Sequence, residues 1–159
     1  ELWVYLNRKF DHVSWERVVS GPGLASVYDF LRDTDRGPEP SWLGEALEKA
    51  DDRSGLISQI ALEGRCELAV QALDLFVSLY GAEAGNLALK FMATGGLYVG
   101  GGIAPKIADK LRNSSFVESF LNKGRMDKAL RLVPVNIILN DKTALLGSAY
   151  RGAQLESST

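Results

Sequence analysis

The class of fold is indicated by the stretch Leu97-Tyr98-Val99-Gly100-Gly101-Gly102-Ile103-Ala104-Pro105. It passes from an apolar run through three glycines into a helix-forming segment. A buried strand, a glycine turn and a helix in this order can bring backbone amides close to a nucleotide. Glycine lacks the Cβ that would block such an approach, and the start of a helix offers unpaired N–H groups. The stretch is neither a G-x-G-x-x-G fingerprint nor a Walker loop. The local pattern alone therefore favours a structural turn, with a nucleotide contact as the alternative.

A second strand is predicted at Val133–Leu139, with Pro134 at its start or edge because proline cannot donate to a ladder. Two strands form a marginal sheet by themselves and favour further strands beside them. The chain opens at Glu1 without methionine, in what reads as the middle of a helix. We therefore expect part of an α/β protein, a fragment or processed product whose earlier sequence supplies the missing strands.

The rest of the apolar pattern is helical. Ser14 and Ser41 are expected to cap the helices that follow them, and Pro22 suits the first turn of another helix. The longest helix is predicted to end at a break at Gly81. The helices predicted before this break are Leu2–Arg8, Trp15–Val19, Pro22–Leu31, Trp42–Ala50 and Arg53–Tyr80, and those after it are Ala82–Ala93, Ala104–Leu111, Ser115–Leu121 and Thr143–Gly152. The end of the chain, from Glu156, is expected to fray.

Composition narrows the class of protein. At 159 residues and 46% hydrophobic content, the chain is long enough for one domain with a substantial core. A net charge of −2 favours neither nucleic acid nor an anionic membrane as a partner, and no apolar stretch approaches membrane-spanning length. The lone Cys66 cannot form an internal disulfide and is expected to be a small buried residue, which suits a reducing cytoplasm.

Few residues are candidates for chemistry. His12 is the only histidine and is expected at the surface, and with one cysteine it cannot form a tetrahedral zinc site. Asn140-Asp141 follows the second strand, where ligands gather in α/β sheets, but capping of the next helix is the favoured interpretation. Glu16 is expected in the first turn of its helix, where its carboxylate could accept hydrogen bonds from paired sugar hydroxyls. A purely local role in that turn is at least as well supported.

Five segments together resemble one family. Residues 12–24 resemble the H-V-S-x-E-R-V-x-S-G-P-G-L segment of bacterial ATP-dependent glucokinases. The other four resemble family motifs in the same order and with similar spacing, and they are Gly85-Asn86-Leu87-Ala88-Leu89, Gly95-Gly96-Leu97-Tyr98-Val99-Gly100-Gly101-Gly102-Ile103-Ala104-Pro105, Phe120-Leu121-Asn122-Lys123-Gly124-Arg125 and Leu145-Leu146-Gly147-Ser148-Ala149.

The resemblance implies an actin-like, ribonuclease H-like sugar-kinase fold, in which two α/β domains close over glucose and Mg·ATP. Residues 1–159 would be the helix-rich C-terminal portion of the large domain, without the N-terminal domain or the catalytic base. The resemblance assigns glucose binding to Glu16 and the adenosine side of ATP to Gly100, Gly101 and Gly102. It implies a cytoplasmic glycolytic enzyme, most simply a homodimer, and an inactive isolated chain with no metal ligand of its own. Residues 33–62 match no motif.

Two other functions stay open. One is a kinase of the same superfamily that acts on another hexose or on an acetylated amino sugar, although the Cys/His cluster of the zinc-bearing branch is missing. The other is a non-catalytic scaffold domain that has kept the fold. Glu16 and the three glycines are intact, which favours the enzyme.

Overall fold

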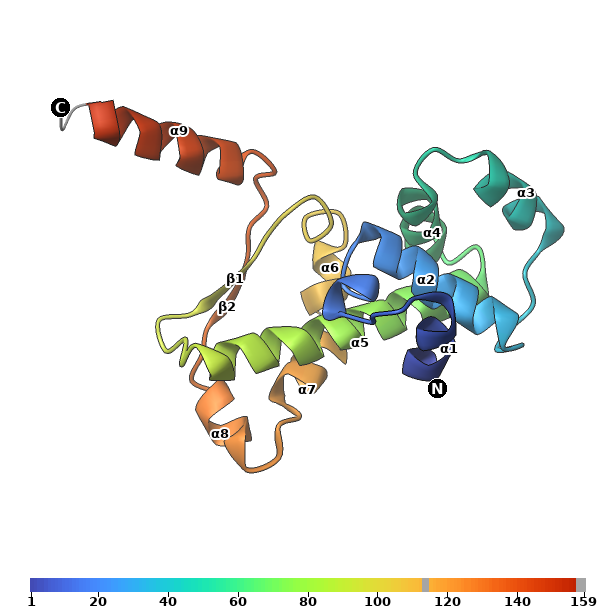
Figure 1. The fold of residues 1–159 in the computed structure, drawn as a ribbon, viewed down its shortest axis with the longest axis horizontal. Coiled ribbons are helices and arrows are strands. Elements are labelled where there is room, and N and C mark those ends of the chain that lie inside the picture. Colours follow the sequence, from blue (N-terminus) through green and yellow to red (C-terminus); the bar gives the residue numbers. More distant parts are fainter. Residues whose placement is uncertain (113–114, 157–159) are drawn as a thin grey trace.

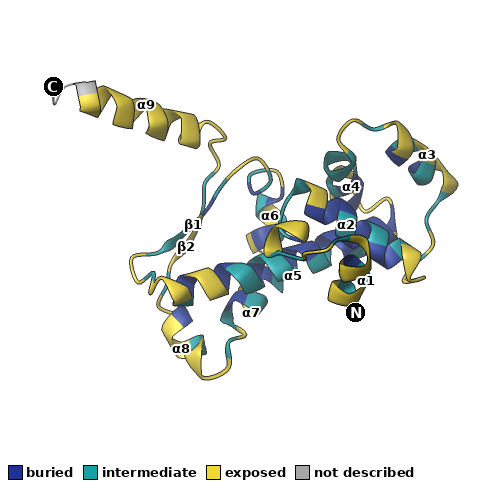
Figure 2. Cartoon of the chain, in the orientation of Figure 1, coloured by how far each residue is buried: buried dark blue, intermediate teal, exposed yellow. Residues whose placement is uncertain are grey.

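A single long helix organises the molecule. In this computed structural model, which describes residues 1–112 and 115–156, helix α5 (Glu67–Lys90) spans 24 residues and crosses the body of the protein (Figure 1). Helices α2 (Gly21–Asp33) and α4 (Arg53–Leu62) pack against its first half, and α7 (Ser115–Leu121) packs along it. The core therefore lies between α5 and the helices that surround it (Figure 2).

The structure has further helices and strands besides these four helices. They are α1 (Leu2–Lys9), the 3-10 helix η1 (Trp15–Arg17), α3 (Ser41–Lys49), strand β1 (Leu97–Val99), α6 (Ala108–Arg112), the 3-10 helix η2 (Gly124–Met126), α8 (Asp127–Leu130), strand β2 (Val135–Ile137) and α9 (Thr143–Glu156). No helix within the described ranges has both the length and the apolar character needed to cross a bilayer.

The two predicted strands pair in parallel. Leu97 lies opposite Val135 and Val99 opposite Ile137. The prediction that Pro134 borders the second strand is confirmed, because its carbonyl accepts a hydrogen bond from the Leu97 amide at 2.8 Å just before β2 begins. These are the only two strands in the described part of the chain.

Two predictions about the long helical region are wrong. The helix expected over residues 53–80 is divided into α4 and α5, because the chain turns at Gly64, where φ is +66°. Gly81, expected to end a helix, lies inside α5 and is buried. A Cβ there would lie 2.1 Å from the carbonyl oxygen of Phe116, and one on Gly85 would lie 2.5 Å from that of Phe120. These glycines therefore serve close packing of α7 on α5.

Helix starts also differ from expectation. Neither Ser14 nor Ser41 makes a side-chain cap; Ser41 is itself the first residue of α3, and Ser14 precedes a 3-10 helix instead of the expected longer helix. Ser20 and Asp52 cap α2 and α4 instead. The expected start of α6 at residue 104 is also wrong. Residues 103–107 form a turn in which the carbonyl of Ile103 accepts from two amides, so α6 begins at Ala108.

Helix α9 stands away from the body (Figure 1). It extends to Glu156, four residues beyond the predicted end, and the remainder of the segment expected to fray, residues 157–159, lies outside the described residues. Its side chains from Thr143 to Leu155 are all exposed (Figure 2). The fold class expected from the sequence, a helix-rich α/β arrangement with a small sheet, is confirmed.

Candidate functional site

The segment around Glu16 is held in place by one serine. Ser20 Oγ donates a hydrogen bond to the carbonyl oxygen of Glu16 at 2.7 Å and accepts one from the amide of Gly23 at 3.0 Å. The hydroxyl therefore joins η1 to the first turn of α2. Gly23 must be glycine for this approach, because a Cβ there would lie 2.7 Å from the carbonyl carbon of Val18.

Glu16 lies in the first turn of η1, as predicted, and its side chain is exposed. It lines an open hollow of about 840 Å³ together with Lys9, Phe10, Asp11, His12, Ser14, Arg17, Ser20, Pro22, Gly23 and Ser26. No described residue donates a hydrogen bond to its carboxylate, so the structure gives no capping role to the side chain. Both carboxylate oxygens are thus available to accept hydrogen bonds from a ligand.

The three glycines after β1 have different surroundings. A Cβ on Gly100 would lie 3.1 Å from Ile138 Cδ1, so this glycine keeps the turn close to the end of β2. Gly101 has a φ of +98°, a conformation that other residues rarely adopt. Gly102 faces open space, with nothing within 4 Å of a Cβ placed there. In the described part of the chain, the amides of Gly101, Gly102 and Ile103 donate to no carbonyl, which leaves successive donors available.

Glu16 and the glycines flank the same helix end. Gly102 and Ile103 line a small cavity of about 70 Å³ together with Gly21 and Leu24, at the start of α2. Glu16 lines the larger hollow with Pro22 and Gly23 of that same first turn. The start of α2 therefore separates the predicted sugar contact from the predicted nucleotide contact.

The other sequence candidates have local roles. His12 is exposed, as expected, in the hollow that Glu16 lines. Asn140 Oδ1 accepts from the amide of Lys142 at 2.9 Å, and the Asn140 carbonyl accepts from Thr143 Oγ1 at 2.7 Å, so this pair forms the turn that precedes α9. Cys66 is buried, as predicted, but lies just before α5 instead of inside a helix. No group of three metal-ligating side chains occurs among the described residues.

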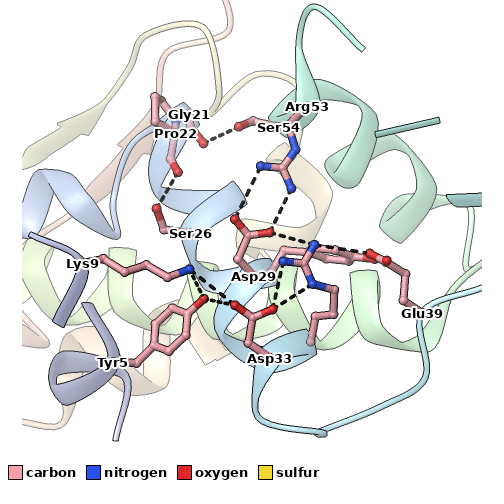
Figure 3. A network of polar contacts seen from close by, with 12 residues as sticks. Tyr5, Lys9, Gly21, Pro22, Ser26, Asp29, Asp33, Glu39, Arg53 and Ser54 are labelled. Carbon is pink, nitrogen blue, oxygen red and sulfur yellow. Dashed lines mark hydrogen bonds and ion pairs between the residues drawn. The ribbon is translucent and has the colours of Figure 1, made fainter. Parts of the chain in front are cut away.

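A network of charged side chains braces the outer face of α2 (Figure 3). The hydroxyl of Tyr5 and the ammonium of Lys9, both on α1, contact the carboxylate of Asp33. The hydrogen bond from Tyr5, followed by one from Arg32, lowers the pKa of Asp33. Burial, reinforced by its bond to Asp33, raises the pKa of Tyr5. The network therefore favours the ionised carboxylate and holds α1 against α2.

No sequence motif indicates a functional role for the start of α4, although this segment borders the small cavity. Asp52, Ser54, Gly55 and Ser58 line that cavity beside Gly102 and Lys106. Asp52 is exposed and caps α4, because its carboxylate accepts a hydrogen bond from the Gly55 amide at 2.8 Å. An aspartate at this spacing before an apolar helical pattern is a capping signal, and the helix start predicted at Arg53 is confirmed.

Three comparisons with known proteins agree. The family model described as Glucokinase matches residues 1–155. A glucokinase of Synechocystis is 44% identical over 97% of this chain and 47% of its own length, and one of Nostoc punctiforme is 46% identical over 98% and 49%. The structure is similar to the crystal structure of a glucokinase from an Antarctic psychrotroph, with a TM-score of 0.77, 36% identity, and coverage of 93% of this chain and 43% of that one. The chain spans about half the length of the curated relatives it matches.

Proposed function

The chain belongs to the glucokinase family, and from this premise we propose that it is part of an enzyme that phosphorylates glucose with ATP to give glucose 6-phosphate. The observation that carries the proposal is the position of Glu16 and the triglycine turn on two sides of the first turn of α2. A sugar and a nucleotide bound at these two places would both lie beside one helix end. Phosphoryl transfer needs the two substrates held next to each other with the reacting atoms in line, and a shared helix end can position both.

On the sugar side, Glu16 is the proposed ligand. Its carboxylate is exposed in a hollow of about 840 Å³, large enough for a hexose, and no described residue occupies its acceptor positions. An ionised carboxylate can accept hydrogen bonds from two neighbouring hydroxyls at once, which fixes the orientation of a sugar ring. Glu16 would thus hold the sugar and take no part in proton transfer.

On the nucleotide side, the triglycine turn after β1 is compatible with ATP, the nucleotide that the family implies. Gly101 and Gly102 present no side chain, a Cβ on either would meet only open space, and the amides of residues 101–103 have no carbonyl partner in the described ranges. A nucleotide supplies the phosphoryl group, and Mg²⁺ accompanies it. Gly100, Gly101 and Gly102 would hold the adenosine side, and no residue of this chain is assigned to the metal.

The chain would contribute binding and orientation. Phosphoryl transfer depends mainly on alignment and on neutralisation of the γ-phosphate, so residues that hold the two substrates at a fixed separation raise the rate. We place residues 1–159 as the C-terminal portion of the large domain of a two-domain cytoplasmic kinase, with the catalytic base on the remaining portion. The exposed apolar side chains of α9, Leu145, Leu146 and Tyr150, suit a helix that packs against further chain or, in a homodimer, a second copy.

The test uses two single substitutions in the full-length protein. In calorimetric titrations, Glu16→Gln is expected to weaken glucose binding at least tenfold, because an amide offers one acceptor where the carboxylate offers two. Gly102→Ala is expected to raise the KM for ATP without lowering stability, because its methyl group enters open space that the nucleotide would use.

Each substitution has a matched control. Glu45→Gln changes an exposed glutamate on α3, and Gly95→Ala adds a methyl group at the other end of β1, where a Cβ also meets nothing within 4 Å. Both controls should behave as wild type. Unchanged glucose affinity in Glu16→Gln would remove Glu16 from the sugar site, and an unchanged KM for ATP in Gly102→Ala would remove the triglycine turn from the nucleotide site.

A further inference from the structure

The first turn of α4 makes a long-range contact with the site that no sequence motif indicated. Ser54 Oγ donates a hydrogen bond of 2.5 Å to the carbonyl oxygen of Gly21, the first residue of α2 (Figure 3). Ser54 is partly buried, and its position is set by the capping of α4 through Asp52 and Gly55. The hydroxyl therefore projects from a fixed helix start.

A second contact holds the same two helices at another point. The guanidinium of Arg53 binds the carboxylate of Asp29 through two bonds, of 2.9 and 3.4 Å (Figure 3). Asp29 lies about two turns beyond Gly21 along α2. A bidentate pair of this kind fixes geometry as well as contributing energy. With Arg53 at one point and Ser54 at the other, α2 is restrained both from sliding along α4 and from pivoting away from it at its start.

Ser54 is connected to both sides of the candidate site. It lines the small cavity beside Gly102 of the triglycine turn. The residue it binds, Gly21, directly follows Ser20, whose hydroxyl holds the backbone of Glu16. We propose that Ser54 is a positioning residue that fixes the separation between the nucleotide side and the sugar side by anchoring the first turn of α2, an inference that rests on the proposed function.

The proposal has a kinetic signature. Each substrate would still meet its own contacts in the absence of the Ser54 hydroxyl, so the affinity for either one alone should change little. The alignment between the two would loosen, and displacements of an ångström or less between reacting groups lower the rate of transfer steeply. Loss of the hydroxyl should therefore reduce kcat while the KM values stay close to those of wild type.

The test compares two serines of α4 in the full-length protein. Ser54→Ala removes the contact with α2, whereas Ser58→Ala is the matched control, because Ser58 lines the same cavity but its hydroxyl donates to Gly55 of its own helix at 3.0 Å. For Ser54→Ala we expect kcat with glucose and ATP to fall about tenfold, with both KM values within about twofold of wild type. Ser58→Ala should keep the wild-type kcat, and Ser54→Thr, which retains the hydroxyl, should restore most of the activity.

The outcomes separate this inference from the function on which it rests. An active wild type with full kcat in Ser54→Ala overturns the positioning role alone, as does an equal loss of kcat in Ser58→Ala. A wild type without activity on glucose overturns the proposed function and this inference with it. If Ser54→Ala does not fold, Ser54→Cys, which is nearly isosteric and a weak donor, takes its place and is expected to show the same kcat loss with unchanged KM values.

Discussion

At the scale of single residues, the site depends on hydroxyl groups that bond to the backbone. Ser20 joins η1 to α2, and Ser54 joins α4 to α2, each through a carbonyl oxygen of the neighbouring element. A bond to a main-chain oxygen fixes the position of the chain itself. The side chain of Glu16, the proposed sugar ligand, can then remain exposed while its backbone is held by the bond from Ser20.

Asp33 provides a prediction for the dependence of stability on pH. Its pKa is lowered from the ordinary 3.8 by the hydrogen bond from Tyr5 and by Arg32, so folding favours the ionised form. This contribution is complete above about pH 4 and is lost as the pH falls through the lowered pKa. Because the carboxylate is partly exposed, Asp33→Asn should lower the free energy of unfolding at pH 7 by only about 0.2–1 kcal/mol.

Urea denaturation at a series of pH values measures this effect. The difference between Asp33→Asn and wild type should be constant from about pH 7 to about pH 5, and should shrink as the pH falls below about 4. Asp51→Asn, at an exposed position next to the start of α4, is the control and should show no such trend. A stability gap for Asp33→Asn that stays constant as the pH falls below about 4 would contradict the assignment.

At the scale of elements, the closeness of α5 and α7 rests on Gly81 and Gly85. Substitution of Gly81 by alanine should destabilise the protein by about 1–3 kcal/mol, because the new Cβ would lie 2.1 Å from a backbone oxygen of α7 that cannot turn aside. The gain in helix propensity, about 1 kcal/mol, offsets only part of this loss.

Gly147→Ala is the matched control for this prediction. Gly147 also lies within a helix, α9, but a Cβ there meets nothing within 4 Å. Its replacement should therefore leave stability unchanged or raise it by up to about 1 kcal/mol. If both alanine variants are equally stable in thermal unfolding, the close packing of α7 on α5 is not what requires glycine at position 81.

The same elements show what could be read from the sequence. The strand at residues 97–99, the turn after it and the helix starting near Pro22 follow from local rules and are confirmed. The predicted helix end at Gly81 is wrong because sequence alone does not distinguish a glycine that ends a helix from one that lets a second helix pack closely. The break at Gly64 was missed because the apolar spacing is nearly continuous across it. Contacts such as Ser54 with Gly21, 33 residues apart, leave no local signal.

At the scale of the whole molecule, the sequence matches identify the family, whereas the fold determines which segments of the chain lie together. The family follows from five segments in order and from matches over nearly the whole chain. The arrangement of the segments is a property of the fold, which brings residues 16–24 and 100–103 to one helix end although about 80 residues of chain separate them. The proposed division of labour between the sugar side and the nucleotide side depends on that arrangement.

The measurement that tests the account most directly is a steady-state kinase assay of the full-length protein with ATP and a panel of sugars that includes glucose, another hexose and an acetylated amino sugar. The account predicts the highest kcat/KM for glucose, with formation of glucose 6-phosphate. It also predicts no turnover by residues 1–159 alone. Failure of the full-length protein to transfer phosphate to any of these sugars, or a clear preference for the amino sugar over glucose, would contradict it.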